Sequence, residues 1–358
     1  MSSNGMTYAP MGRPSPVVKP GEFAIAAIGL DHGHIYGQCN GLTEAGAHVK
    51  WVFDEQPARA AKFAEKYPGC RVARSESEVL EDGEVRLVAA AAIPNQRGAL
   101  GCRVMRAGKD YFTDKTPFTT LAQLAEAKRV VVETGRKYMV YFSERLHVEC
   151  ATVATRLVDS GAIGRPLQVI GMGPHRLGTG RPDWFFTKEQ YGGILCDIGS
   201  HQIEQFLHYC RVDDATVVNA NVANYANAGT PEFEDFGEAN LVGSNGCSNY
   251  FRVDWFTPAG LRTWGDGRLT ILGTEGYIEL RKYVDIGSGA AAPDGDVLIL
   301  VNKQGESRIN CAGTDGFPYF GRLIRDCLDR AETAMTQAHA FKAAELCLKA
   351  QLVARRLA

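Results

Sequence analysis

Continuous apolar segments alternate with amphipathic ones from Phe23 to about Tyr141. FAIAAIG (23–29) and VRLVAAAAIP (85–94) are apolar almost throughout, which is typical of strands buried on both faces of a sheet. QPARAAKFAEKY (56–67) and QRGALGCRVMRAG (96–108) have helical spacing instead, and the second ends at a glycine, a common helix C-terminus. The alternation predicts a parallel, doubly wound Rossmann sheet.

The pattern changes after Glu144. A predicted helix over 147–161 leads to a strand over 165–172, and another helix begins near Gly193. Residues 215–309 then contain successive strand-like segments with polar–apolar alternation, which favours a mostly antiparallel sheet. Two helices, at about 319–331 and 338–356, close the chain. The fold class predicted is therefore α/β: an N-terminal Rossmann domain and a C-terminal α+β domain with a large, open sheet.

The predicted boundaries are 1–21 for an N-terminal segment, 22–143 for the Rossmann domain and 144–358 for the second domain. The first segment is rich in Ser, Gly and Pro and lacks the apolar core of a signal peptide. It is either a disordered tail, the preferred interpretation, or an arm that crosses a neighbouring subunit. We expect the active site in the cleft between the two domains, at the carboxyl ends of the parallel strands.

Composition narrows the function classes. The chain has 358 residues, of which 45% are hydrophobic and 22% charged, and its net charge of −2 gives no electrostatic case for nucleic acid or an anionic membrane. No apolar run approaches the roughly 20 residues of a membrane span. The 10 cysteines are scattered without a Cys-x-x-Cys pair, which favours reduced thiols in the cytoplasm over a zinc site.

The segment AAIGLDHGHIYGQ (26–38) lies where a phosphate-binding turn is expected. Gly29 ends the first strand, but Asp31 and His34 stand where the glycine pattern would continue, and Gly33 comes one place early. A damaged phosphate loop, a metal site and a rebuilt site are the alternatives. Since no further acidic or thiol cluster joins the histidines in sequence, we predict no metal. We expect a modified nucleotide turn, in which His32, Gly33 or His34 supplies helix-start N–H groups.

In such a turn, Asp31 would cap the helix or point away from a pyrophosphate, since a carboxylate there would repel it. Asp54 ends the second strand, where an acid suits a hydrogen bond to a ribose 2′-hydroxyl and disfavours a 2′-phosphate, so NAD is predicted over NADP. The alternative is that Asp54 caps the next helix. Pro94 and Asn95 follow the third buried strand and are expected to line the same site.

Two further segments carry candidate chemistry. Lys115, in DKTP (114–117), lies just past a short strand and could hydrogen-bond a substrate hydroxyl, although a surface lysine is the simpler alternative. In GGILCDIGSHQIEQFLHY (192–209), Asp197 and His201 are four residues apart, which predicts one shared helix face in apolar surroundings. This pair is an acid/base unit, a structural hydrogen-bonded pair or part of a metal site.

These segments, with SGAIGRP (160–166) and GTEGYIEL (273–280), resemble the Gfo/Idh/MocA family of NAD(P)-dependent sugar and polyol oxidoreductases from Phe23 onward. The resemblance implies that Asp114, Lys115 and Thr116 correspond to the family's Glu-Lys-Pro motif, with the proline shifted to Pro117. It also implies that His201 accepts the hydroxyl proton, Lys115 polarises that oxygen and Asp197 holds the geometry. The glycine fingerprint is degenerate, and Arg97 stands where many members have histidine.

Substrate contacts are expected from polar side chains near the catalytic segments. The candidates are Arg97, Arg145, His175, Arg176 and Trp184. The substrate predicted is a small carbohydrate or polyol, and a homodimer or homotetramer through the C-terminal sheet is expected. Two alternatives remain open: a catalytically silent sugar- or nucleotide-binding regulator, and an enzyme that uses bound NAD for transient oxidation, as an epimerase or eliminating glycosidase.

Overall fold

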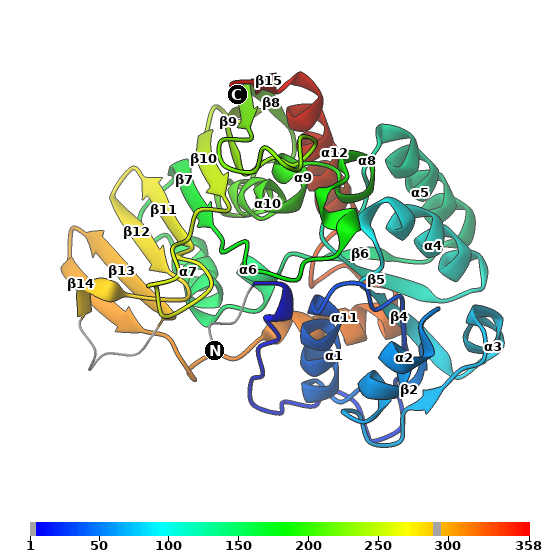
Figure 1. The fold of residues 1–358 in the computed structure, drawn as a ribbon. Coiled ribbons are helices and arrows are strands. Elements are labelled where there is room, and N and C mark those ends of the chain that lie inside the picture. Colours follow the sequence, from blue (N-terminus) through cyan, green and yellow to red (C-terminus); the bar gives the residue numbers. More distant parts are fainter. Residues whose placement is uncertain (1–4, 289–294) are drawn as a thin grey trace. The chain divides into compact units, whose positions relative to one another are not determined.

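The computed structural model describes residues 5–288 and 295–358 (Figure 1). The chain forms two compact units, each of which we describe by itself. The first unit contains residues 6–141 and 317–341. The second unit contains Gly5 and the described residues of 142–316 and 342–358.

The first unit is built on a six-stranded parallel sheet in the order β3-β2-β1-β4-β5-β6. Its strands are β1 (Ala24–Ile28), β2 (His48–Phe53), β3 (Arg71–Val72), β4 (Val85–Ala90), β5 (Asp110–Asp114) and β6 (Tyr138–Tyr141). Strands β1, β5 and β6 are buried at every position, which the apolar sequence of β1 requires, while β5 also buries Asp110 and Asp114. This order and direction confirm the predicted doubly wound sheet.

Helices cover both faces of this sheet. They are α1 (His34–Glu44), α2 (Pro57–Ala64), α3 (Glu76–Glu81), α4 (Pro94–Arg106), α5 (Leu121–Thr134) and α11 (Pro318–Asp329). Consecutive residues of β5 point to opposite faces. Phe112 packs against Phe320 of α11, whereas Tyr111 lies against Gly101 of α4, where an added Cβ would approach the Tyr111 ring to 2.7 Å.

The place of residues 317–341 differs from the predicted domain division. These residues belong to the first unit rather than to the C-terminal domain. Arg330 pairs with Asp110 at 2.7 Å, and the Tyr138 amide donates to Gln337 Oε1 at 2.8 Å. Phe320 fills the space over Gly41 of α1, where a Cβ would lie 2.4 Å from its ring. The Rossmann sheet is thus completed by a segment that comes late in the chain.

The N-terminal segment packs on its own chain over its described part. The Ser15 and Val17 amides donate to the Glu44 and Ala45 carbonyls at 2.8 and 2.9 Å, and the Gly12 amide donates to Glu44 Oε1 at 2.7 Å. These contacts differ from the preferred expectation of a disordered tail. Residues 1–4 of the predicted 1–21 segment lie outside the described residues.

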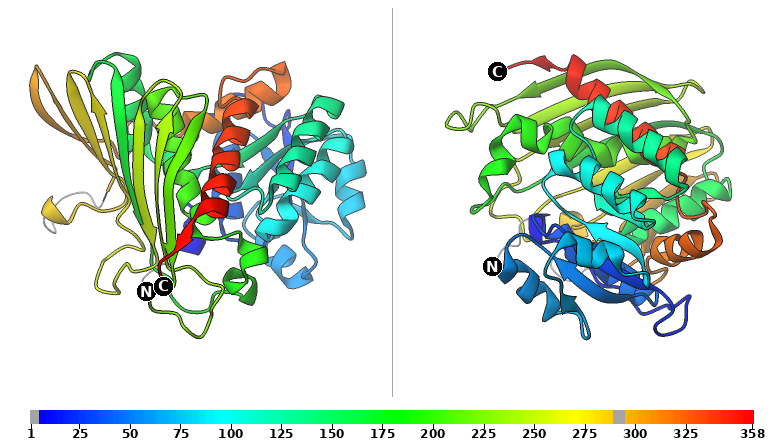
Figure 2. Two further views of the ribbon diagram at one scale, coloured as in Figure 1. Left: turned by 90° about the horizontal axis from the view of Figure 1, so that it is seen from above. Right: turned by 90° about the vertical axis from the view of Figure 1, so that its right-hand side faces the viewer.

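The second unit contains a nine-stranded sheet in the order β14-β13-β12-β11-β7-β10-β9-β8-β15, seen nearly edge-on in the left view of Figure 2. The β7–β10 and β8–β15 pairs are parallel and the other pairs antiparallel, which confirms a mostly antiparallel sheet. The strands are β7 (Pro166–Pro174), β8 (Ala215–Ala223), β9 (Phe236–Gly243), β10 (Ser248–Asp254), β11 (Arg268–Gly273), β12 (Gly276–Arg281), β13 (Val297–Asn302), β14 (Gly305–Asn310) and β15 (Arg355–Arg356).

Helices pack on one face of this sheet. They are α6 (Ser143–Leu146), α7 (Glu149–Asp159), α8 (Lys188–Tyr191), α9 (Ile194–Asp197), α10 (Gly199–Cys210) and the second-unit part of α12 (Gln337–Val353). Helix α10 contacts β7 and β10, where Gly171 and Gly173 leave room for Gln202. Short 3-10 turns cover Gly5–Thr7, Asp183–Phe186 and Ile286–Ser288. Among the described residues, no helix is long and apolar enough to span a membrane.

Candidate active site

The turn between β1 and α1 has the left-handed glycine that its position demands. Gly29 has φ = 71°, and a Cβ there would lie 2.8 Å from Cβ of Ala92. Its amide donates to the Phe53 carbonyl at the end of β2, at 3.1 Å. The turn is therefore fixed against β2 and against the residues that follow β4.

Asp54 connects this turn to the next helix. Its Oδ2 accepts from the Leu30 amide at 2.7 Å, and its Oδ1 accepts from the Gln56 amide at 2.8 Å, just before α2. The side chain is only 1% exposed. The acid at the end of β2 thus holds the two βα turns together. It does not cap α2, because the N-cap position of that helix is Gln56, and no side chain of the described residues caps it.

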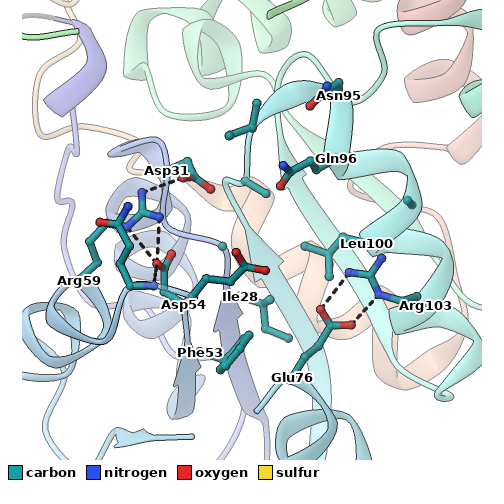
Figure 3. Close-up of a pocket in the computed structure, with 16 residues that line it drawn as sticks. Ile28, Asp31, Phe53, Asp54, Arg59, Glu76, Asn95, Gln96, Leu100 and Arg103 are labelled. Atoms are coloured by element: carbon teal, nitrogen blue, oxygen red, sulfur yellow. Dashed lines mark hydrogen bonds and ion pairs between the residues drawn. The ribbon is translucent and has the colours of Figure 1, made fainter. Parts of the chain in front are cut away.

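A pocket of about 530 Å³ lies at the carboxyl ends of β1, β2 and β4 (Figure 3). Four residues predicted to bind a cofactor line it: Gly29, Asp31, Asp54 and Asn95. Asn95 is the second residue of α4, and its side-chain Oδ1 is buried without a hydrogen-bond partner among the described residues. Pro94 occupies the first turn of the same helix, where its missing N–H is not needed.

Three amides of the β1–α1 turn already have acceptors within the chain, those of Leu30, His32 and His34. The His32 amide donates to the Ala91 carbonyl at 2.9 Å, and the His34 amide donates to Nδ1 of His32 at 3.2 Å. Gly33 precedes α1, and a Cβ on it would lie 2.3 Å from the Met6 carbonyl oxygen. A phosphate at this turn would have to displace these bonds if it used the His32 or His34 amide.

Arg59 is a pocket residue that the sequence interpretation missed. Its NH1 group donates to Asp31 Oδ1 at 2.7 Å and its Nε donates to Asp54 Oδ1 at 2.9 Å, so one guanidinium joins two carboxylates. The available signal was its position five residues after Asp54, within the first turns of the following helix. Asp31, expected to cap α1 or point away, instead lines the pocket beside this arginine.

Asp114 lies between the two turn histidines. Its carboxylate oxygens are 2.9 Å from Nδ1 of His34 and 3.5 Å from Nδ1 of His32, and all three residues are buried. The premise that no acidic group joins these histidines is therefore wrong, because β5 brings Asp114 to them from far along the chain. The three groups have metal-ligating chemistry, but Arg97 NH2 also lies 3.4 Å from Asp114 Oδ2 and already supplies a cation there.

Arg97 holds the loop that carries Lys115. It is 1% exposed, and its guanidinium donates to the carbonyls of Ala92 at 2.6 Å, of Thr116 at 3.1 Å and of Lys115. The guanidinium of Arg97 therefore makes its hydrogen bonds within the chain and does not face an open surface. Lys115 is also buried, at 7% exposure, and its charge contributes to lowering the pKa of His32.

The stability of the first unit should depend on pH through His32. Burial and the neighbouring His34 hold the pKa of His32 well below its usual value, although Asp114 opposes them. The unfolded chain takes up a proton there below about pH 6.5 and the folded chain does not, so stability falls as pH drops below that value. Urea unfolding between about pH 7 and pH 5 should show this loss, and His32→Gln should reduce it. Equal slopes for both proteins would contradict the assignment.

The helix that carries Asp197 and His201 is interrupted. Asp197 ends α9, whereas His201 lies in the first turn of α10, and Ile198 separates the two helices. The prediction of one continuous helix face is wrong at this point, although Ile198 keeps helical dihedral angles and its amide donates to the Ile194 carbonyl. His201 is 2% exposed, and Asp197 is close enough to influence the buried guanidinium of Arg181.

A buried carboxylate near His201 was not predicted. Glu144 Oε2 accepts from Lys282 Nζ at 2.7 Å and from Gln202 Nε2 at 3.0 Å, while Nε2 of His175 is 3.9 Å from Oε1. Burial alone would raise the pKa of Glu144, but Lys282, His201 and His175 lower it to about 2. Glu144 is thus a fixed negative charge beside two histidines.

The other predicted substrate residues have partners within the second unit. Arg145 donates to Glu204 at 2.8 Å, and Arg176 donates to the carbonyls of Pro258 and Leu261 at 2.9 and 2.6 Å. Trp184 is buried in the Asp183–Phe186 turn, and the ring of His175 packs against two tryptophans. Their contact with a substrate stays a prediction.

Comparisons with known proteins agree with this architecture. Residues 24–142 match the sequence model described as an oxidoreductase family with an NAD-binding Rossmann fold, and residues 152–279 match that of the GFO/IDH/MocA C-terminal domain. A crystal structure from Erwinia carotovora atroseptica, described only as an oxidoreductase candidate, is 51% identical. It covers 94% of this chain and 100% of its own, with a TM-score of 0.90.

Two curated relatives are more distant. The scyllo-inositol 2-dehydrogenase (NAD(+)) of Bacillus subtilis is 26% identical over 259 residues, which are 71% of this chain and 72% of that protein. The D-xylose dehydrogenase of Paenarthrobacter nicotinovorans is 29% identical over 150 residues, 40% of this chain. That second match spans only 38% of the relative's own length.

The pocket of the first unit fits a nicotinamide dinucleotide in its chemistry. Gly29 gives the close backbone approach that a diphosphate needs. Asp54 has the position at the end of β2 that suits a ribose hydroxyl, but both its oxygens already accept hydrogen bonds within the chain. The unsatisfied Oδ1 of Asn95 is a hydrogen-bond acceptor on the same wall. Ile28, Leu100 and Ala99 supply apolar surface for an adenine ring.

Proposed function

Because the chain belongs to the Gfo/Idh/MocA family of oxidoreductases, we propose that it is an NAD-dependent dehydrogenase for a secondary hydroxyl of a sugar, an inositol or a related polyol. The observation that carries the proposal is the pocket at the carboxyl ends of β1, β2 and β4, with Gly29 and Asp54 in its wall. Two relatives of the chain, a D-xylose dehydrogenase and a scyllo-inositol 2-dehydrogenase, support the proposed substrate class.

The proposed reaction removes a hydride from the carbon that bears the hydroxyl and a proton from its oxygen, and leaves a carbonyl product. NAD supplies the hydride acceptor. His201 takes the hydroxyl proton, Lys115 donates a hydrogen bond to the same oxygen, and Asp197 fixes the geometry of the acid/base unit. Each group acts where its charge suits the step, since a cation beside the oxygen stabilises the developing alkoxide.

Buried groups behind these residues act as positioning residues in this proposal. Arg97 donates to the Lys115 carbonyl and lies near Asp114. It therefore fixes the lysine loop, whereas the sequence had suggested that it contacts substrate. Glu144 is a negative charge near His201 and favours the imidazolium that forms when His201 accepts the proton. Lys282 and Gln202 hold that carboxylate in place.

We also propose self-association through the open face of the nine-stranded sheet. Directly paired residues form a row across this face: Tyr277, Leu272, Gln168, Ser248 and Val242. Three of them are large apolar side chains that are 39–42% exposed. A second copy would cover this surface. A strictly monomeric mass in light scattering would argue against it.

The proposed function is tested by cofactor binding followed by a substrate panel. Calorimetry of the full chain should detect NAD and a weaker interaction with NADP, since Asp54 disfavours a 2′-phosphate. A panel of aldoses, inositols and other polyols should then contain a compound that produces NADH, followed by its absorbance. Failure to bind NAD would contradict every enzymatic version. NAD and sugar binding without turnover of any compound would favour the silent regulator, and turnover without net NADH would favour transient oxidation.

A further inference from the structure

Asp31 places an acid where a dinucleotide turn normally has a small residue. The second residue after the strand-ending glycine of such turns approaches the pyrophosphate, and a carboxylate there repels it. In this chain Asp31 lines the same pocket as Gly29 and Asp54, and its side chain is 16% exposed. Some other group must offset its charge if the pocket is to hold a dinucleotide.

Arg59 lies where that offset is required. Its NH1 is 2.7 Å from Asp31 Oδ1, and its Nε and NH2 are each 2.9 Å from Asp54 Oδ1 (Figure 3). These two acids raise the pKa of the Arg59 guanidinium, although burial opposes them. The guanidinium is part of the pocket wall and is 31% exposed, so it also faces the space that a ligand would occupy.

The remaining charges of the pocket do not replace Arg59. Arg103 lines the opposite wall, where its Nε and NH2 donate to Glu76 at 2.7 and 2.9 Å (Figure 3). That pair cancels locally. Glu55 adds a further acid to the lining. Without Arg59, Asp31 and Asp54 would be two negative charges on the wall that receives the diphosphate.

We propose that Arg59 is a cofactor-affinity residue, which cancels the charge of Asp31 at the diphosphate position and so replaces the missing glycine of the turn. The proposal rests on the NAD binding of the proposed function. It predicts that the penalty for losing Arg59 comes from Asp31 and is felt by ligands that carry phosphate. It also predicts that adenosine, which carries no phosphate, loses less affinity than NAD or ADP when Arg59 is replaced, although Arg59 also contacts Asp54.

The test is calorimetry of the full chain with NAD, ADP and adenosine as separate probes. Arg59→Gln should weaken NAD and ADP about tenfold or more and change adenosine affinity by less than about threefold. Asp31→Asn alone should bind NAD at least as well as the parent. The double variant Arg59→Gln/Asp31→Asn should recover most of the lost NAD affinity. Arg129→Gln is the matched control, because Arg129 joins Glu126 and Glu133 in the same way outside the pocket.

Three results would overturn the inference: unchanged NAD affinity in Arg59→Gln, an equal loss for adenosine and NAD, or a double variant as weak as Arg59→Gln. An equal loss would assign Arg59 a purely structural role. If the parent protein does not bind NAD at all, the proposed function itself fails, so the two failures are distinguishable. Thermal unfolding of each variant shows whether it is folded before its affinity is measured.

Discussion

Lys115→Ala is expected to lower kcat about 10²–10⁴-fold with the best substrate of the panel, the range typical of a lost acid/base or hydrogen-bonding group. The rate falls because Lys115 is the cation that stabilises the developing alkoxide in the proposed reaction, and its side chain is removed. Lys115 is buried, and Arg97 fixes its backbone, so a neighbouring chain segment cannot easily supply a substitute. Steady-state kinetics with saturating NAD measures the effect.

Lys128→Ala, on the exposed side of α5, is the matched control for Lys115 and should keep the parent's turnover. His201→Ala is the partner variant. It should lose turnover to a similar extent and also lose the acid limb of the pH–rate profile. Parent-like kcat in both Lys115→Ala and His201→Ala would sink the assigned mechanism while leaving the family and the fold untouched.

Lys282→Met is expected to destabilise the second unit by about 3–5 kcal/mol, because it leaves Glu144 as an unpaired charge in a buried site. Lys282 is fully buried and Glu144 is 1% exposed, so water cannot take over the lost interaction. Adding Glu144→Gln should recover part of the loss, since the second change removes the uncompensated charge while a side-chain amide still meets Gln202. Urea unfolding of the three proteins measures both effects.

The surface pair of Lys303 and Glu275 provides the control. Both side chains are more than half exposed, so Lys303→Met should cost less than about 1 kcal/mol. Equal destabilisation by Lys282→Met and Lys303→Met would show that the buried pair contributes no more than an exposed one. A Glu144→Gln change that deepens the loss in the double variant would also contradict this account.

The Rossmann sheet was predictable because β1 and β4 are almost wholly apolar and amphipathic helices alternate with the strands, two of which end near Gly108 and Gly135. Strand β14 lies at the end of the strand-like region 215–309, but its bounds could not be predicted, because GESRIN is an exposed edge strand without polar–apolar alternation. The transfer of residues 317–341 to the first unit depends on how Phe320 fits over Gly41, which no local pattern encodes.

Some residues of the candidate site could likewise be predicted from the sequence, and others could not. Gly29 and Asp54 follow directly from their positions at the ends of buried strands, and the structure places both in one pocket. The pair of Glu144 and Lys282 joins residues 138 positions apart, so composition and spacing could not reveal it. The contact of Asp114 with the turn histidines was not predicted for the same reason, since His34 and Asp114 are 80 positions apart. Each of these groups is buried, and its partner is chosen by tertiary packing rather than by neighbouring residues.

The late segment 317–341 has a consequence for how the chain is made. A nascent chain that has emerged only as far as Tyr141 contains all six strands of its first sheet but lacks the helix whose Phe320 covers Phe112 and Tyr141. Asp110 also lacks its ion-pair partner Arg330 until residue 330 has been synthesised. The first unit therefore remains incomplete on the ribosome while strands β7 to β14 of the second sheet are synthesised, and its uncovered apolar surface is prone to aggregation during that interval.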